Sequence, residues 1–235
     1  MAIADSRIPI PLPNTENIQG SLLDTLTNNP PSVTIMTDCT GRNVVFVYKI
    51  CKTEESAQRQ REFERSLLEL MKSVPYDAIS VTDLCNHVGI ARKNFYRYFG
   101  NKDDVLCALL DHTRLDYSKY EIPDFCDAVT APKEIVQYLS YWQKEKPLLD
   151  ALSANGLSTK LIERVLMHAW QQDTGFLRVL EVGGKEADPN TVLFAVSGII
   201  TLVVTWHHSG YKEPKEQLAS AIFRLMTEPI ATVPQ

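Results

Sequence analysis

The chain has 235 residues, 44% of them hydrophobic and 23% charged, which is enough to bury the core of one large domain or two smaller ones and excludes a disordered tail. Its formal net charge of −5 also excludes a protein that coats nucleic acid over its whole surface, because phosphate binding needs accumulated Lys and Arg. The stretch from Lys49 to Lys102 nevertheless holds ten basic and seven acidic residues, which predicts a basic module on an acidic body.

The N-terminal region, residues 1–52, differs in composition from the rest. Residues 1–31 contain five prolines, which disfavour helix and predict an irregular arm. The arm lacks a basic stretch followed by an apolar run, so we expect no secretory signal. The β-branched and aromatic runs VTIMTD and NVVFVYKI then flank CTGR, where Gly41 can adopt the positive φ of a tight turn. This pattern predicts a β-hairpin.

After Thr53, apolar residues recur at the three- and four-residue spacing that is typical of helices. The first helix has an apolar stripe that ends before Pro75 and comprises Phe63, Leu67, Leu70, Met71 and Val74. Ser80 precedes Asp83 by three residues, which predicts a capping box at the start of a short helix. Gly89 is expected to end that helix.

A tight turn at Ile90 leads into ARKNFYRYF, the second short helix of this pair. Its inner side holds Phe95 and Phe99, and its outer side holds Arg92, Lys93, Tyr96 and Arg97. Two helices joined by a Gly-containing turn, the second of them basic on its free face, suit docking in the major groove of DNA. Arg can read guanine, Asn can read adenine, and Lys neutralises phosphate.

The remaining sequence predicts more helices. Asn101, with Asp104 three residues on, caps a helix that runs to about Tyr120. Four further helices are expected at about 131–152, 158–180, 189–208 and 214–227. The apolar stretch from Val192 to Trp206 is interrupted by polar residues and is short for a bilayer, so we expect a buried helix and no membrane span.

The run ISVTDLCNHVGIARKNFYRYFGNKDDVL, with LLELMKSVPYDAI before it, resembles the signature of the TetR family of transcriptional regulators. The resemblance implies an all-α fold, with a three-helix DNA-binding head containing a helix-turn-helix at 53–103 and a helical effector-binding and dimerisation domain at 104–235. The run FAVSGIITLVVTWHHSGYKEPKEQLASAIFRLM is similar to the last two helices of the family. These pair in a four-helix interface, which implies a homodimer through about 189–227. Residues 191–206 are apolar nearly all round, which supports the same prediction.

The resemblance also implies which residues contact operator DNA. Ser80 and Tyr98 should touch phosphates, and Lys102 should hold a phosphate at the start of the next helix. Tyr96 should lie against backbone or a base. Positions that read base edges or adjoining phosphates are Thr82, Arg92, Lys93 and Asn94, with Arg97 as a further candidate. Ala91 departs from the family, which usually has Ser or Thr there, so this helix lacks a side-chain cap worth about 1 kcal/mol.

In this family the middle helices enclose an effector, whose binding shifts the populations of two arrangements of the DNA heads. Candidate lining residues, for which ordinary core packing is the alternative, are Tyr117, Tyr138, Tyr141, Trp142, Trp170 and Phe176. Few charges fall on the inner faces, so we expect a small, mainly apolar effector. No cofactor is expected.

Other chemistry-bearing residues give weaker signals. The five cysteines form no CxxC pair and are odd in number, which argues for a reducing cytosol and against a disulfide framework or a zinc site. A redox pair of Cys39 with Cys51, on either side of the predicted hairpin, stays an alternative to plain thiols. Adjacent His207 and His208 point about 100° apart on a helix, which predicts no metal site. The isolated histidines, expected at the surface or as satisfied core residues, are His87, His112 and His168.

Three functional readings follow from the sequence. We expect a cytoplasmic, homodimeric repressor that binds a pseudo-palindromic DNA operator and responds to a small molecule; the operator, the effector, the regulated genes and the sign of regulation stay open. The alternative is a co-regulator that keeps the fold but docks on a partner protein. An enzyme is disfavoured, because the chain has no G-x-S-x-G, HExxH or P-loop motif. The roles of the arm and hairpin stay open: they extend the DNA contact through Arg42, Lys49 and Lys52, or the hairpin packs on the body or pairs with another edge strand.

Overall fold

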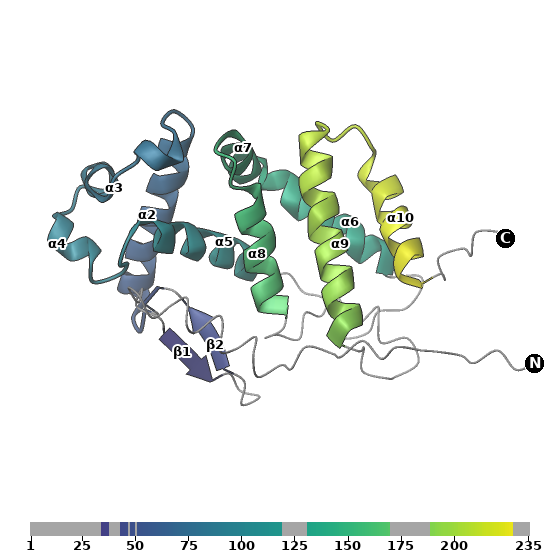
Figure 1. The fold of residues 1–235 in the computed structure, drawn as a ribbon, viewed down its shortest axis with the longest axis horizontal. Coiled ribbons are helices and arrows are strands. Elements are labelled where there is room, and N and C mark those ends of the chain that lie inside the picture. Colours follow the sequence, from purple (N-terminus) through teal and green to yellow (C-terminus); the bar gives the residue numbers. More distant parts are fainter. Residues whose placement is uncertain are drawn as a thin grey trace, which may run out of the picture.

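A computed structural model of the chain describes residues 34–37, 43–46, 48–49, 51–118, 131–169 and 189–227. Within these ranges the protein is almost entirely helical (Figure 1). The predicted all-α fold class is therefore confirmed. Two short strands are the exception: β1 (Thr34–Thr37) pairs with β2 (Asn43–Phe46) in antiparallel register. The arm and residues 38–42, where the turn was expected, lie outside the described residues, so the turn remains a prediction.

The N-terminal group of helices, called the head below, consists of α2 (Glu54–Met71), the 3₁₀ turn η1 (Tyr76–Ala78), α3 (Val81–Val88) and α4 (Arg92–Phe95). Its core side chains, all with 0% exposed surface, are Phe63, Leu67, Leu84, Phe95 and Phe99. The Phe63 ring meets those of Phe95 and Phe99 edge-on, with centroids 5.2 and 5.9 Å away. Such edge-to-face contacts are favourable and directional. They hold α4 against α2 and keep the opposite face of α4 on the outside.

The body comprises α6 (Ala131–Lys144), α7 (Lys146–Ala154), α8 (Ser158–Ala169), α9 (Pro189–His208) and α10 (Lys215–Thr227). Helix α5 (Lys102–Ser118) runs from the head into the body (Figure 1). Helix α10 packs against α6, and α8 lies between α5 and α9. The helices predicted at 189–208 and 214–227 are confirmed to within one residue.

The single helix expected at about 131–152 is wrong, because α6 and α7 are separate helices that meet at Glu145. Pro147 explains the break. Its ring lacks an N–H group and clashes with the carbonyl four residues earlier, whereas it is tolerated in the first turn of a new helix. Helix α8 ends at Ala169, and the rest of the predicted 158–180 helix lies outside the described residues.

A buried cluster of charged side chains joins α5 to α8. The Arg164 guanidinium donates to both carboxylate oxygens of Asp111, with its Nε 2.9 Å from Oδ1. His168 Nε2 lies 2.9 Å from the same Oδ1. Burial would raise the pKa of Asp111, but the hydrogen bonds from His168 and Arg164 outweigh it and lower that pKa. The carboxylate therefore stays ionised in the interior.

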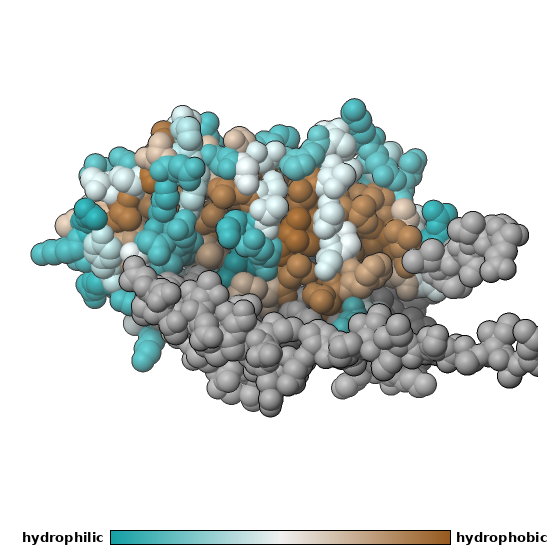
Figure 2. Space-filling view, in the orientation of Figure 1, coloured by the Kyte–Doolittle hydropathy of each residue, from teal (hydrophilic) through white to brown (hydrophobic). Residues whose placement is uncertain are grey.

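Helix α9 is less buried than the sequence suggested. By length and composition alone the stretch Asn190–His208 could cross a membrane, and only 28% of it is buried inside the protomer. The side chain of Phe194 is 74% exposed, and Leu225 on α10 is 63% exposed. Figure 2 shows hydrophobic side chains on both sides of α9, toward α8 and toward α10, with a paler strip along α9 between them. The prediction of a buried helix is thus wrong for the single chain, because α9 keeps an uncovered face.

Candidate nucleic-acid interface

Both ends of α3 are set by local features that the sequence predicted. Ser80 Oγ accepts from the Asp83 amide at 3.2 Å, and the Asp83 carboxylate accepts from the Ser80 amide at 2.8 Å. This capping box fixes the start of α3. Gly89 ends the helix with φ 77°, a left-handed conformation that glycine adopts at little cost. The turn toward α4 therefore has a defined direction.

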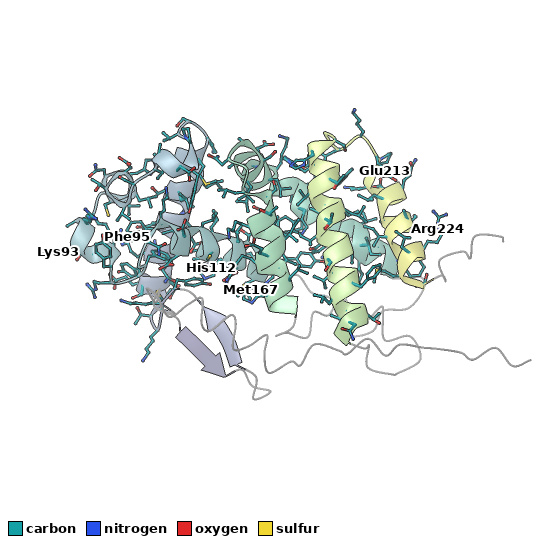
Figure 3. The ribbon with its side chains drawn as sticks, in the orientation of Figure 1. Lys93, Phe95, His112, Met167, Glu213 and Arg224 are labelled. Carbon is teal, nitrogen blue, oxygen red and sulfur yellow. The ribbon has the colours of Figure 1, made fainter. Side chains whose placement is uncertain are left out.

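Helix α4 has only four residues and depends on its neighbours. Ala91 occupies the N-cap position and makes no side-chain capping bond, as its sequence predicts. Phe95 is fully buried in the aromatic core of the head. Figure 3 shows Lys93 at the outer end of the head and Phe95 on the inner side of the same helix. The helix is thus held by its buried face rather than by its own length.

The outer face of α4 is cationic and aromatic, as predicted. Arg92, Lys93 and Arg97 are exposed, Asn94 is half-buried, and the Tyr96 ring is 42% exposed. Arg92 Nε donates to the Tyr96 hydroxyl at 3.1 Å, and its guanidinium lies 5.8 Å from the centre of the Tyr96 ring. This contact keeps Arg92 extended along the helix surface. The face can neutralise phosphates and present donors to base edges.

The other residues predicted to contact DNA differ in their exposure and in their present hydrogen bonds. Thr82 is exposed on the first turn of α3. The Ser80 hydroxyl donates to the Asp83 carboxylate at 2.6 Å, and the bonds from Ser80 lower the pKa of Asp83. Tyr98 is half-buried and its ring lies 6.3 Å from that of Phe63. Thr82 is therefore accessible at the surface, while Tyr98 is partly packed in the head.

Lys102 has a different environment from the one the sequence suggested. Its ammonium donates to the carbonyl oxygens of Tyr76, Asp77 and Ile79 at 2.7, 3.1 and 3.0 Å. It also lies 4.6 Å from the centre of the Tyr76 ring. Three bonds use all three ammonium hydrogens. Lys102 therefore ties the start of α5 to the end of η1, and its predicted contact with a phosphate remains a prediction.

Asn155, which sequence reasoning missed, joins the body to the head. It lies in the turn after α7, and its Oδ1 accepts from the Tyr76 amide at 2.6 Å. Its Nδ2 donates to the Ala151 carbonyl at 2.8 Å and approaches that of Met71 at 3.4 Å. The Asn-Gly pair indicated only a turn. Its bonds to Tyr76 and Met71 join positions that are 79 and 84 residues apart in the sequence. No local sequence pattern could therefore indicate them.

The predicted effector-lining residues form an aromatic cluster in the body. The Tyr117 ring lies 5.0 Å from that of Tyr138 and 5.2 Å from that of Tyr141. Trp142 lies 6.2 Å from Tyr138 and is 1% exposed. Burial raises the pKa of Tyr138 to about 12. These four rings pack on one another, and the remaining two, Trp170 and Phe176, lie outside the described residues. Their role in effector binding remains a prediction.

The residues considered for a metal or redox site make other contacts where the structure describes them. His207 Nε2 lies 2.8 Å from Asp150 Oδ1, and His208 Nε2 lies 3.5 Å from Ser158 Oγ. In the described ranges, no three His, Cys, Asp or Glu side chains gather as a metal site. Burial raises the pKa of Cys51, which disfavours the reactive thiolate that a redox role needs. Cys39, its suggested partner, lies outside the described residues.

A short, outward-facing basic helix set by a glycine turn on a helical scaffold defines a helix-turn-helix regulatory protein. Residues 66–109 match the family model described as "Bacterial regulatory proteins, tetR family". The matched range covers α3, the turn, α4 and the first half of α5. Over this range the chain is similar to the DNA-binding domain of TetR-family transcription regulators. No curated protein matches it.

Several solved structures are similar to the chain at low identity. One is the "Dihydroxyacetone kinase operon activator DhaS", 18% identical over 71% of this chain and 93% of that one, with a TM-score of 0.46. A tetR-family transcriptional regulator from Streptomyces coelicolor is 17% identical over 72% and 79%, with a TM-score of 0.48. The fatty acid degradation regulator FadR from Bacillus halodurans is 16% identical over 75% and 96%, with a TM-score of 0.44. Likeness at this level says nothing about what this chain binds.

Proposed function

We propose that the chain is a sequence-specific transcription regulator of the cytoplasm, a repressor rather than an enzyme, that binds operator DNA through α4. The observation that carries the proposal is the two-sided character of this helix. Phe95 is fully buried on one side, and Arg92, Lys93 and Arg97 are exposed on the other. A protein that recognises base edges in a DNA groove needs hydrogen-bond donors held at fixed positions. The buried side of α4 fixes its backbone, and the exposed cationic side chains supply the donors.

The proposed DNA contacts follow from this placement. Arg92, Lys93 and Asn94 read base edges or adjoining phosphates, and Arg97 adds a phosphate contact at the far end of the helix. Thr82, exposed on the first turn of α3, is a further candidate for such a contact. Tyr96 presents a ring to the DNA backbone or a base. Ser80 and Tyr98 contact phosphates through hydroxyl groups, which for Ser80 requires the hydroxyl hydrogen to turn away from Asp83.

We further propose that the protein acts as a homodimer through α9 and α10. Their most exposed large apolar side chains are Phe194 and Leu225, and an uncovered apolar face of this kind marks an interface. The exposed side of α9 also carries Thr201 and Thr205, polar residues that suit a protein interface better than lipid. Twofold symmetry would place two copies of α4 about 34–36 Å apart on a pseudo-palindromic operator.

The body, residues 104–235, is proposed to bind a small, mainly apolar effector near the aromatic cluster. Effector binding can alter DNA affinity only through a different affinity for two arrangements of the head. The bonds from Asn155 to the end of α2 and to Tyr76 provide a direct mechanical connection between the two parts. A shift of the turn after α7 would be transmitted to the head at this point.

The test is binding to labelled DNA from upstream of the chain's own gene over a series of salt concentrations. The wild type should bind specifically, and Arg92→Ala with Lys93→Ala should weaken binding by about a hundredfold or more, since each specific contact is worth about 1–3 kcal/mol. The matched control is Lys146→Ala with Lys160→Ala, which removes the same charge from the body. No binding by a folded wild-type dimer would contradict the proposal and indicate docking on a partner protein.

A further inference from the structure

The recognition helix α4 needs support at its C-terminal end. It has four residues, and no side chain caps its N-terminus. The last carbonyl groups of any helix have no partner within the helix and must be satisfied from elsewhere. In α4, the Phe95 carbonyl accepts from the amides of Tyr98 and Phe99 at 2.9 and 3.1 Å. The carbonyls of Tyr96 and Tyr98 accept from a distant part of the chain.

Lys49, from the segment before α2, supplies both of these bonds. Its ammonium donates to the Tyr96 carbonyl at 2.9 Å, and its backbone amide donates to the Tyr98 carbonyl at 3.3 Å. A cation at this end of a helix also interacts favourably with the helix dipole. A residue 47 positions upstream therefore caps the C-terminus of the recognition helix.

Lys49 is itself held in place by buried neighbours. The Gln60 side chain, on α2, is 2% exposed and donates from Nε2 to the Lys49 carbonyl at 2.5 Å. Tyr48 is 1% exposed. Its ring lies 6.4 Å from that of Phe99 and meets the His112 ring edge-on at 5.6 Å. The two residues thus contact α2, the end of α4 and α5 together.

Tyr48 also reaches the buried charge cluster. Burial, followed by the negative charge of Asp111, raises the pKa of Tyr48. Asp111 is the carboxylate that binds Arg164 and His168 of α8. By its contacts, the segment at 48–49 connects the end of the recognition helix with α2 and α5.

We propose that Tyr48 and Lys49 form a clamp that positions the recognition helix for DNA binding. Lys49 caps the C-terminal end of α4, and Tyr48 anchors the segment between the head and α5. Both are positioning residues that act through α4 rather than by touching DNA. This inference rests on the proposed DNA-binding function, but the clamp itself exists without DNA and can be measured in its absence.

The first experiment is amide hydrogen exchange of the DNA-free protein. Lys49→Met removes the donor to Tyr96 but keeps most of the side chain, and the amides of residues 96–99 should exchange roughly tenfold faster. Lys49→Arg should restore protection, because a guanidinium can donate to the same carbonyl. The exposed Lys52→Met is the control and should leave exchange at 96–99 unchanged. Unchanged exchange in Lys49→Met would overturn the clamp.

The second experiment separates positioning from direct phosphate contact. Lys49→Met should weaken operator binding roughly three- to tenfold, with the salt dependence of the affinity unchanged. A salt slope lower by about one would instead mean that Lys49 neutralises a phosphate, and it would overturn the positioning role. Gln60→Met removes the bond to Lys49 without changing charge, and it should weaken binding in the same direction.

The two experiments also separate failure of the clamp from failure of the proposed function. Faster exchange in Lys49→Met with no DNA binding by the wild type would leave the clamp intact and overturn the DNA-binding function. Wild-type binding with identical affinity and exchange in Lys49→Met and Gln60→Met would overturn the clamp alone. Circular dichroism of each variant confirms that its helices are intact.

Discussion

The recognition helix α4 and the long helix α9 differ in what stabilises them. Helix α4 has four residues, one fully buried aromatic side chain and a cationic outer face. Helix α9 has 20 residues and only partial burial within the protomer. A helix as short as α4 cannot form alone, so its conformation depends on contacts from α2, α3 and Lys49. Helix α9 is long enough to persist but exposes apolar surface.

This difference indicates that the two helices meet different partners. The outer face of α4 is polar and needs no cover, and it can stay in water until DNA neutralises it. The exposed face of α9 carries Phe194 among small and polar residues such as Gly198, Thr201 and Thr205. The exposed aromatic side chain costs free energy in water, which supports the proposed association with a second copy. The outer face of α4 therefore needs no protein partner, whereas the proposed dimer would cover the exposed side chain of Phe194 on α9.

The largest expected effect is the loss in the free energy of unfolding when the buried cluster of Asp111, Arg164 and His168 is broken. Asp111→Asn keeps the shape of the side chain but leaves Arg164 and His168 without their carboxylate. It should lower the free energy of unfolding by about 3–5 kcal/mol, because an uncompensated buried charge is costly. The control is Asp150→Asn at the surface, which should cost below about 1 kcal/mol. Urea unfolding at pH 7 measures both, and equal losses would contradict the account.

The same variant has a predicted pH dependence. The folded-state pKa of Asp111 is lowered, so its stabilising effect is complete above the ordinary carboxyl pKa, roughly 4, and is lost as the pH falls through the lower folded value. The stability difference between the wild type and Asp111→Asn should therefore shrink below about pH 4. A constant difference from pH 7 to pH 3 would show that folding does not lower the pKa of Asp111.

A smaller effect tests the exposed face of α9. Phe194→Asp should weaken the dimer by about 2 kcal/mol or more, as expected for an aromatic residue in an interface. The stability of the protomer should change little, since Phe194 is 74% exposed there. Sedimentation equilibrium measures the dimer constant. Thr159→Asp, exposed on α8, is the control and should remain dimeric.

Gly198 gives an independent variant for the same face. A Cβ atom added at Gly198 meets nothing within 4 Å in the protomer. Gly198→Leu should therefore fold normally and obstruct only a partner packed closely on α9. A dimer of unchanged strength in both Gly198→Leu and Phe194→Asp would place the interface elsewhere.

The smallest effect concerns the N-terminus of α4. Ala91 has extended backbone angles, φ −67° and ψ 139°, which suit a capping side chain. Ala91→Ser should stabilise the head by about 1 kcal/mol and strengthen operator binding by up to about fivefold. Ala91→Val has no capping group and should give no such gain. Thermal unfolding and DNA titration measure the two effects, and weaker binding by Ala91→Ser would show that the uncapped end is needed for function.

The head was predictable because its signals are local. Ser80 and Asp83 form their capping box within four residues of sequence, and Gly89 supplies the left-handed turn. The inward direction of Phe95 follows from helical periodicity. Lys102 was the exception. Its ammonium binds carbonyls 23 to 26 positions upstream, and no local pattern indicates such a contact.

The body was predictable only in outline. The ranges of α9 and α10 followed from apolar periodicity, but the break at Glu145 required giving Pro147 more weight than the helical pattern around it. The pairing of Asp111 with Arg164 and His168 joins positions 53 and 57 residues apart. Each of these residues alone resembles a solvated surface charge. Contacts of this kind depend on the packing of α5 against α8.

The most direct test of the central claim is selection of binding sites from a pool of random DNA duplexes by the purified dimer. The account predicts enrichment of a pseudo-palindrome whose half-sites are centred about 34–36 Å apart, or a multiple of one helical turn. Selection with Arg92→Ala and Lys93→Ala combined should lose that sequence. Enrichment of no sequence by the folded wild type, or of the same sequence by the double variant, would contradict recognition through α4.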